Sequence, residues 1–285
     1  MKYTYSKMIR DFEKKVSEAN LEVHAVKWMF FNSDLFCGYS NLNNEVNEEV
    51  KEKFAKMVDR YINELVPPQY ILNKTFFFNY PFYVDEGCFI PRPETEQLVE
   101  ETIYRIDDLR NNDNKHLKIA DVCCGSGAIG ITLKKEIENC DVFMCELSSD
   151  AVNITKKNAA SLDADVTVEC GDFINPILEK KLKFDVLLCN PPYIKNSEVL
   201  DEMVVGHEPN MALFGGVDGL DFYRIIFAHF DEIINDKGFM GFEFGYDQKE
   251  LLEELVKKTF PNYKYEFLKD YNKLDRMLFI YKNLD

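Results

Sequence analysis

Apolar residues follow a helical spacing through the N-terminal part of the chain. Up to about residue 65 they recur at intervals of three and four, which places them along one face of an α-helix. The longest such stripe consists of Val46, Val50, Phe54, Met57, Val58, Tyr61, Ile62 and Leu65. Pro67 and Pro68 end the pattern, because the residue before a proline is displaced from helical backbone angles. We therefore expect a small helical bundle over residues 1–68.

The next segment, residues 69–89, is aromatic and rich in β-forming residues. Its Asp85-Glu86-Gly87 sequence has the composition of a turn, so the segment predicts a β-hairpin or linker between two domains. The run from Ile90 to Glu96 reads Ile-Pro-Arg-Pro-Glu-Thr-Glu and introduces a new helical pattern. Proline and acidic residues in a first turn favour helix initiation, and by itself the run indicates only a rigid entry to a helix.

From Leu117 onward, short apolar runs alternate with helical stretches. The expected strands are Leu117–Val122, Val142–Glu146, Val166–Glu169, Phe184–Cys189, Phe239–Phe244, Tyr263–Leu268 and Met277–Tyr281. This alternation is typical of an α/β fold with a Rossmann-like, doubly wound parallel sheet, which we place within residues 90–285. No helix is expected between the last two strands, so they predict an antiparallel C-terminal edge pair.

One expected strand, Phe184–Cys189, stops abruptly at the tetrapeptide Asn190-Pro191-Pro192-Tyr193. Proline has no backbone N–H, so the strand must end there in a rigid corner. In open α/β sheets, ligands bind beyond the carboxyl ends of the strands. Asn190 is therefore expected at the place where the chemistry occurs.

Three other strand ends carry residues suited to a nucleoside-containing cofactor. The glycines of Gly125-Ser126-Gly127 allow close approach of the backbone to a ligand, and the helix that follows offers free N–H groups. Glu146 is placed to accept hydrogen bonds from a ribose diol. Asp172 could meet the amino group of a base, and Phe173 could stack on the base. NAD is a competing cofactor, but Asn-Pro-Pro-Tyr has no task in hydride transfer.

Composition narrows the class of protein further. The chain has 285 residues and 46% hydrophobic content, enough for one large domain with a smaller one and a sizeable core. No apolar run approaches the roughly 18 residues of a membrane span. The N-terminus lacks the apolar middle of a signal peptide. We therefore expect a cytoplasmic protein with no membrane partner.

The cysteines argue against a metal site or disulfides, and the charge argues against a nucleic-acid substrate. The eight cysteines contain no Cys-x-x-Cys pair and lie mostly in apolar contexts, which favours reduced thiols over a metal site or disulfides. Residues 1–80 carry 11 basic and 11 acidic side chains, so the whole net charge of −16 falls on the remainder. Such a surface repels phosphate backbones, which makes nucleic acid an improbable direct substrate. Acidity could equally serve solubility alone.

Taken in order, these motifs resemble those of a known family. The sequence Asp121-Val122-Cys123-Cys124-Gly125-Ser126-Gly127, the strand-end Glu146, Gly171-Asp172-Phe173 and Asn-Pro-Pro-Tyr is similar to that of class I S-adenosylmethionine-dependent methyltransferases. The Ile90–Glu96 run and the small helical N-terminal domain resemble, more narrowly, the glutamine N5-methyltransferases of peptide chain release factors (the HemK/PrmC family). The resemblance covers nearly the whole chain.

The resemblance implies that the substrate is a protein, a peptide chain release factor. The enzyme would methylate the glutamine of the Gly-Gly-Gln sequence in that factor, and it would act as a monomer. The residues implied to bind S-adenosylmethionine are Asp121, Cys123, Cys124, Gly125, Ser126, Gly127, Glu146, Leu147, Asp172, Phe173 and Asn190. Those implied to bind the substrate are Arg92, Glu94, Thr95, Asn190, Pro191 and Tyr193. The implied catalytic residues are Asn190, Pro191, Pro192 and Tyr193, and no metal is expected.

The sequence departs from the family pattern at three places. Cys123-Cys124 stands where relatives usually carry Gly-Thr, Asn73 replaces a glycine after Ile71-Leu72, and Glu146 stands for the commoner aspartate. None of these changes touches the Asn-Pro-Pro-Tyr corner.

A chemical hypothesis follows for that corner. A carboxamide nitrogen is a poor nucleophile because its lone pair is delocalised into the carbonyl. We expect the side-chain oxygen of Asn190 and the backbone carbonyl of Pro191 each to accept a hydrogen from the target amide. These bonds would fix its direction and favour a pyramidal nitrogen, while Tyr193 covers the planar group. Prolines 191 and 192 would keep the corner rigid.

Three alternatives remain open from the sequence. A nucleic-acid amino methyltransferase, of the adenine N6 type, would use the same tetrapeptide on a similarly conjugated NH2 group. The acidic C-terminal part and the lack of a basic, aromatic recognition segment weigh against it. A non-catalytic cofactor-binding scaffold would have no need of the intact corner. An N5-glutamine methyltransferase of a ribosomal protein is separated only weakly by sequence.

Overall fold

The computed structural model describes residues 2–110 and 115–284. Within them the chain forms two compact units. Unit 1 comprises the chain up to Lys74 together with Leu200–His207, and unit 2 comprises Thr75–Val199 and the chain from Glu208 onward. The chain therefore returns to the N-terminal unit for one short segment late in the sequence.

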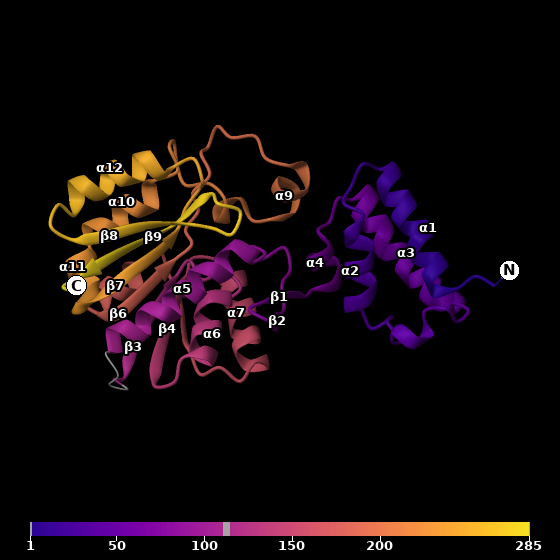
Figure 1. Ribbon diagram of the computed structural model, residues 1–285, viewed down its shortest axis with the longest axis horizontal. Coiled ribbons are helices and arrows are strands. Elements are labelled where there is room, and N and C mark those ends of the chain that lie inside the picture. The colour runs from indigo at the N-terminus through magenta and orange to yellow at the C-terminus, as the bar shows by residue number, and fades with distance from the viewer. Residues whose placement is uncertain (1, 111–114, 285) are drawn as a thin grey trace. The chain divides into compact units, whose positions relative to one another are not determined.

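Unit 1 is helical (Figure 1). Its α-helices are α1 (Tyr5–Glu18), α2 (His24–Asn32), α3 (Glu48–Asn63), α4 (Pro68–Leu72) and α9 (Glu202–His207). Side chains cap two of them: Thr4 accepts from the N–H of Lys7, and Asn47 accepts from the N–H of Glu49. The rings of Phe12 and Phe30 meet that of Phe54 edge to face in the core. Packing of these apolar stripes, rather than helix propensity alone, holds the short helices together.

The predicted helical bundle contains a largely non-helical connection between α2 and α3. Residues 33–47 contain only the short 3₁₀ helix η1 (Tyr39–Asn41). Gly38 adopts a φ of 96° and lies beside several asparagines, residue types that favour turns over helices. Asn73, which follows α4, has left-handed angles (φ 49°, ψ 41°). That conformation suits glycine best, and asparagine tolerates it.

Unit 2 contains a two-stranded hairpin and a seven-stranded sheet. The hairpin strands are β1 (Thr75–Phe77) and β2 (Tyr80–Phe82). The sheet strands are β3 (Leu117–Val122), β4 (Cys140–Glu146), β5 (Thr167–Cys170), β6 (Phe184–Cys189), β7 (Ile234–Glu243), β8 (Lys264–Lys269) and β9 (Asp275–Lys282). Their order in the sheet is β5-β4-β3-β6-β7-β9-β8. The first five strands in this order, β5, β4, β3, β6 and β7, are parallel to one another. This confirms the predicted doubly wound α/β fold.

The C-terminal strands refine the prediction of an antiparallel edge pair. β8 and β9 do pair antiparallel, but β9 lies between β7 and β8 and is also antiparallel to β7. Only β8 of that pair is at the sheet edge. The buried pattern of β9, with six consecutive buried residues at its end, agrees with an interior position.

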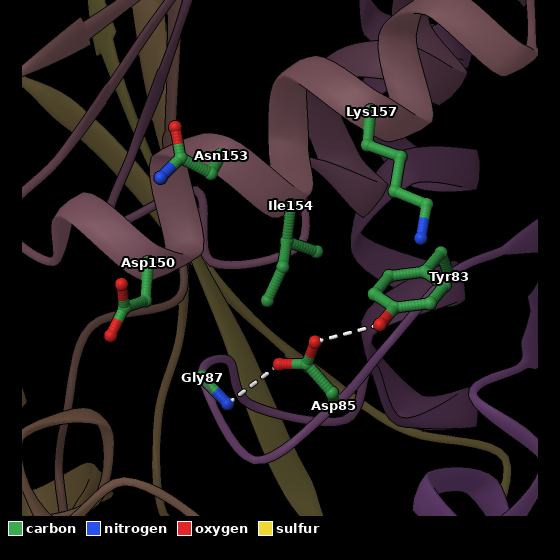
Figure 2. A pocket seen from close by; sticks show the side chains of 7 residues that line it. All are labelled: Tyr83, Asp85, Gly87, Asp150, Asn153, Ile154 and Lys157. Atoms are coloured by element: carbon green, nitrogen blue, oxygen red, sulfur yellow. Dashed lines mark hydrogen bonds between the residues drawn. The ribbon is translucent and has the colours of Figure 1, made fainter.

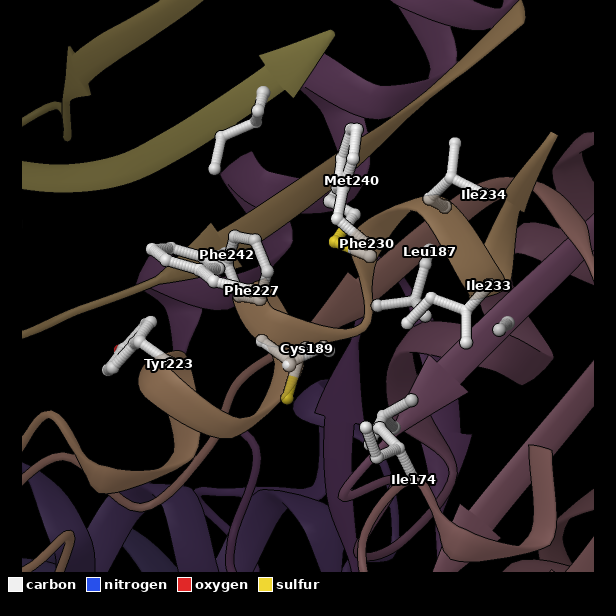
Figure 3. Close-up of a cluster of buried hydrophobic side chains, with 14 of the residues drawn as sticks. Ile174, Leu187, Cys189, Tyr223, Phe227, Phe230, Ile233, Ile234, Met240 and Phe242 are labelled. Atoms are coloured by element: carbon white, nitrogen blue, oxygen red, sulfur yellow. The ribbon is translucent and has the colours of Figure 1, made fainter. Parts of the chain in front are cut away.

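Helices cover both faces of the sheet (Figure 1). One face packs against α5 (Pro93–Arg110), α6 (Ala128–Glu136) and α7 (Ser149–Ser161), and includes the hairpin rings Phe77 and Phe82. The other packs against α8 (Asn175–Glu179), α10 (Asp221–Ala228), α11 (Phe230–Ile233) and α12 (Lys249–Thr259). Figure 3 shows part of that second core, where Leu187, Met240 and Phe242 of the strands meet Phe227 and Phe230.

Along β6, Val186 and Leu188 belong to one core and Leu187 and Cys189 to the other. Alternate side chains therefore anchor the strand on both faces, and the residue after Cys189 is held in a fixed position. No helix in the described part of the chain is both long and apolar enough to cross a bilayer.

Candidate active site

The register of the parallel strands brings four polar strand ends into one row. Val122 of β3 is paired with both Cys145 of β4 and Cys189 of β6, and Cys189 is paired with Phe242 of β7. The residues that follow these positions are Cys123, Glu146, Asn190 and Glu243. They therefore lie at the same level, at the carboxyl edge where open α/β sheets bind ligands.

The loop after β3 has the backbone of a ligand-binding turn. Gly125 has a φ of 54°, and a Cβ atom added to it would meet nothing within 4 Å. Gly127 has a φ of 83°, and its Cβ would lie 2.8 Å from both Ile131 Cδ1 and Thr155 Cγ2. The loop is thus open at Gly125 and closely packed at Gly127, and each requirement favours glycine.

Helix α7 holds this loop through side chains. The hydroxyl of Thr155 donates to the carbonyl of Gly125 (2.7 Å), and the Nδ2 atom of Asn158 donates to that of Ser126 (2.9 Å). Glu146 completes the support, because its two oxygens accept from the N–H groups of Gly125 (2.9 Å) and Ser148 (3.0 Å). The Glu146 carboxylate is therefore fixed beside the loop, and the adjacent Leu147 is exposed.

Asp121 lies beneath the loop and is fully buried. Its Oδ2 atom accepts from the N–H of Gly130 (2.8 Å), while Oδ1 is buried without a hydrogen-bond partner among the described residues. Burial raises the pKa of Asp121 to about 7. An unpartnered carboxylate oxygen, a second carboxylate at Glu146 and the space at Gly125 fit a nucleoside cofactor that carries positive charge.

The thiols of the two cysteines in the loop are held in the neutral form. Cys123 has a φ of 60°, a conformation that glycine adopts more readily, which explains the glycine expected there in relatives. Its hydrogen bond to Cys189, together with burial, raises the pKa of the Cys123 thiol, and burial raises that of Cys124. Thiols held in the neutral form are poor nucleophiles and metal ligands. No group of three or more metal-ligating side chains occurs among the described residues.

The two residues expected at the base end of the cofactor are placed differently from each other. Asp172 is exposed after β5, but Phe173 is only 7% exposed. The Phe173 ring packs edge to face on Phe222, with centroids 5.0 Å apart. The structure therefore places this ring in the core of unit 2 rather than on a surface open for stacking.

The Asn-Pro-Pro-Tyr corner is tied to a buried carboxylate. The Nδ2 atom of Asn190 donates to the hydroxyl of Thr95 (3.2 Å), which donates to Oε2 of Glu243 (2.6 Å). The hydroxyl of Tyr193 donates to Oε1 of the same glutamate (3.2 Å). Burial raises the pKa of Glu243, and burial beside that carboxylate also raises the pKa of Tyr193. Pro191 and Pro192 are buried, and Asn190 is partly exposed.

The chain after the corner is clamped as well. The Nε2 atom of Gln248 donates to the carbonyl of Tyr193 (2.8 Å), and the N–H of Gly215 donates to that of Ile194 (2.8 Å). A Cβ on Gly215 would lie 2.3 Å from the carbonyl oxygen of Pro192, and one on Gly219 would lie 2.1 Å from that of Tyr193. Glycine at positions 215 and 219 therefore allows the backbone of this loop to pack directly against the backbone of Pro192 and Tyr193.

The residues predicted to bind the substrate at the start of α5 have distinct surroundings. Arg92 pairs with the buried Glu208 and lies over the Phe89 ring, 4.6 Å from its centroid. Glu94 is half-buried. Thr95 is only 3% exposed, and its hydroxyl is engaged by protein groups on both sides. Thr95 thus lies between Asn190 and Glu243, and its contact with a substrate stays a prediction.

Several residues around the candidate site were not predicted from the sequence. Glu243, Gln248, Thr155, Asn158 and Glu208 support the site, and none was predicted in it. Glu243 carried a usable signal: it is an acid inside the apolar strand Phe239–Phe244, which is not where an unpaired carboxylate belongs. The helix residues had no such signal, because threonine and asparagine are common on helix surfaces.

A hollow of about 370 Å³ opens beside α7 (Figure 2). Asp85 accepts there from the hydroxyl of Tyr83 (2.9 Å) and from the N–H of Gly87 (2.9 Å). The ammonium group of Lys157 lies over the Tyr83 ring. The residues that line the hollow include none of the predicted site residues.

The chain matches a methyltransferase family by sequence, and its fold resembles that of solved structures. Residues 105–208 match the family described as Methyltransferase small domain. The fold resembles that of the N-terminal domain of human METTL16 in complex with SAH, with a TM-score of 0.51 and 14% identity, covering 89% of this chain and 92% of that chain.

Two bacterial relatives are much closer in sequence. The release factor glutamine methyltransferase of Bacillus cereus is 36% identical over 241 residues, which covers 84% of this chain and 84% of that protein. The protein of the same name from Bacillus subtilis is 36% identical over 248 residues, 86% of this chain and 85% of that protein. The resemblance predicted from the motifs is thereby confirmed, and the chain belongs to the release factor glutamine methyltransferase family.

Proposed function

We propose that this enzyme transfers the methyl group of S-adenosylmethionine to the side-chain amide nitrogen (N5) of a glutamine in a peptide chain release factor. The family of the chain supports this substrate, since its relatives carry that activity in their names. When bound, S-adenosylmethionine supplies a methyl group made electrophilic by a sulfonium. We further propose that the enzyme acts as a monomer in the cytoplasm, where release factors work.

The observation that carries the proposal is the state of the Asn190 amide. Its nitrogen is bonded to Thr95, while its oxygen accepts no hydrogen bond from the described residues and is not among their buried unpartnered atoms. An accessible, outward acceptor on a rigid corner can take a hydrogen from an incoming NH2 group. The adjacent Pro191 carbonyl is the second acceptor in this proposal.

The cofactor would be held by the loop and carboxylates on the same edge. Gly125, Ser126 and Gly127 would provide the backbone surface, and Glu146 would bind the ribose diol. Asp121 and Asp172 would contribute negative charge near the amino acid and base ends. Phe173 would support this region from within the core. Cys123, Cys124 and Leu147 would line the loop and the strand end.

The contribution of the protein is then chiefly orientation. Two fixed acceptors would hold the target nitrogen in line with the methyl group, and Tyr193 would cover the amide plane. Positioning of this kind can supply up to roughly 7–11 kcal/mol in favourable intramolecular systems. No strong base is needed, because the proton can leave after the methyl group has been transferred.

We assign recognition of the rest of the substrate to unit 1, which supplies none of the predicted site residues. Hydrogen–deuterium exchange of the full chain, with and without a release factor, tests this assignment. Slower exchange in unit 1 helices on mixing is expected. Unchanged exchange there would limit unit 1 to a structural role.

The central experiment combines mass spectrometry with one substitution. The enzyme is incubated with labelled S-adenosylmethionine and a purified release factor, and the modified residue is located by peptide sequencing. Wild-type enzyme should add one methyl group to a glutamine side chain. Asn190→Ala should reduce turnover by on the order of 10²-fold, as for a lost transition-state hydrogen bond, with cofactor affinity less affected.

Asn153→Ala is the matched control, because Asn153 is an exposed asparagine on α7 and is not among the predicted site residues. It should leave turnover unchanged. A methyl group on another residue type, or full turnover by Asn190→Ala, would contradict the proposed function.

A further inference from the structure

A buried acid lies behind the proposed acceptor. Glu243 is 2% exposed at the end of β7, and its two carboxylate oxygens each accept a hydroxyl group, from Thr95 and from Tyr193. The hydroxyl of Tyr223 donates to its backbone carbonyl (2.6 Å), which fixes the strand end. Burying a carboxylate is unfavourable unless its hydrogen bonds are satisfied, so this acid calls for a reason beyond packing.

The chemistry of Thr95 gives that reason. A threonine hydroxyl has one proton to donate and can accept through its remaining lone pairs. The carboxylate of Glu243 is the stronger acceptor of its two neighbours, so the proton is directed to it (2.6 Å). The Thr95 oxygen can then only accept from its other neighbour, which is the side-chain amide of Asn190 (3.2 Å).

These two hydrogen bonds determine which end of the Asn190 amide faces the protein. Only Nδ2 has protons to give to Thr95, so Oδ1 must face the other way. The reverse orientation would place two acceptor oxygens against each other. Without the carboxylate, the Thr95 hydroxyl could donate to Oδ1, and the amide could rotate to present its NH2 group outward. A donor at that place would repel the NH2 of a target amide.

We propose that Glu243 and Thr95 are positioning residues which, by a relay of two hydrogen bonds, hold the Asn190 oxygen outward as the acceptor for the substrate. Neither residue touches the substrate in this arrangement. The inference rests on the proposed function for its kinetic consequence, but the orientation of the Asn190 amide can be tested without any substrate. The site accordingly takes planar NH2 donors and discriminates against groups that offer only acceptors.

Neutron diffraction from a deuterated crystal of the full chain tests the relay directly. We expect a deuteron on Thr95 Oγ1 directed to Glu243, and two deuterons on the Asn190 atom that faces Thr95. An Asn190 atom without deuterons on that side would overturn the inference. This result stands even if the enzyme proves inactive on release factors, which would instead refute the proposed function.

Paired substitutions test the consequence for the reaction. Thr95→Val removes the hydroxyl with little change in shape, and Glu243→Met removes the carboxylate. Each should lower kcat by about 10–100-fold, as for loss of an outer-shell partner, with the Kd of S-adenosylmethionine within a few-fold of wild type. Thr95→Ser and Glu243→Gln keep the hydroxyl and an acceptor oxygen, and should retain most of the turnover.

The pairing separates positioning from folding. A purely structural role would lower the melting temperature and the cofactor affinity together, and the conservative variants would show no selective rescue of kcat. Wild-type kcat in Thr95→Val, or an equal loss in Thr95→Ser, would overturn the relay. If Glu243→Met fails to fold, Thr95→Val and the neutron experiment decide the question.

Discussion

Asp121 has an environment in the folded protein that differs strongly from that of the unfolded chain. It is fully buried, one of its oxygens has no hydrogen-bond partner among the described residues, and burial raises its pKa from 3.8 to about 7. Between these two values the folded protein binds a proton that the unfolded chain has released. The stabilising contribution of this group is therefore complete below pH 3.8 and is lost as the pH rises to about 7.

Asp121→Asn should remove this dependence, because an asparagine of the same shape remains neutral and can still accept from Gly130. Without cofactor, the unfolding free energy of the wild type should fall relative to that of the variant as the pH is raised from acid to mildly alkaline. The shift should reach roughly 4 kcal/mol. Urea unfolding at both pH values measures it, and Asp150→Asn controls for the loss of one surface charge. An equal difference at both pH values would contradict the prediction.

Some side chains at the site could be predicted individually and others could not. Asn190 and Glu146 stand at strand ends, where a polar residue after an apolar run is itself a signal. Thr95 and Phe173 were predicted to touch ligands, but both are buried. Whether a side chain near a motif points outward or inward depends on what packs around it, and the motif does not contain that information.

At the scale of elements, the corner after β6 is shaped by segments that follow it in sequence. The 215–219 loop and the turn before α12 both contact the backbone of Pro192 and Tyr193. The prolines limit the backbone angles of the corner, and these contacts fix where its carbonyls lie. The position of the acceptors is thus a property of three elements together.

Gly215→Ala should disturb this arrangement. The new Cβ would lie 2.3 Å from the Pro192 carbonyl oxygen and 2.9 Å from Tyr193 Cα, so the backbone of the corner must move. We expect kcat to fall by roughly 10²-fold, since displacements of about 1 Å can have that effect. Calorimetric cofactor affinity should change little. Gly206→Ala, where a Cβ meets nothing within 4 Å, is the control. Equal turnover in the two variants would show that the corner tolerates the movement.

The order of the strands illustrates what periodicity leaves undetermined. Apolar runs located all seven strands of the sheet, including β3 and β6 with their bounds as observed. The insertion of β9 between β7 and β8 could not be predicted from them. An apolar run reports that a strand is buried, whereas its neighbours are chosen by pairing and packing across the whole sheet.

At the scale of the whole molecule, charge and composition separate possible partners. The net charge of −16 falls on the residues after position 80, which include the whole of the candidate active site. Binding to nucleic acid depends mainly on basic side chains that neutralise phosphates. A nucleic-acid amino methyltransferase with this surface would have to overcome repulsion from its own substrate.

We therefore expect RNA and DNA to bind weakly at physiological salt, with a Kd above roughly 10⁻⁴ M. Fluorescence anisotropy of labelled oligonucleotides across a series of salt concentrations measures it. A parallel titration with a release factor provides the positive control. Tight binding that weakens steeply with added salt would favour the nucleic-acid alternative over a protein substrate.

The sequence by itself determined the class of fold, the strands and the chemical kinds of residue at their ends, because hydrophobic spacing and proline act locally along the chain. The sequence also indicated the family, because its motifs occur in the order typical of that family. Only the tertiary structure decided which of these residues meet. It placed Glu243 behind Thr95 and Asn190, buried Phe173, and brought residues 200–207 back to the N-terminal unit. The contact between Thr95 and Glu243, for example, joins positions 148 residues apart, and it arises from register and packing that no local pattern records.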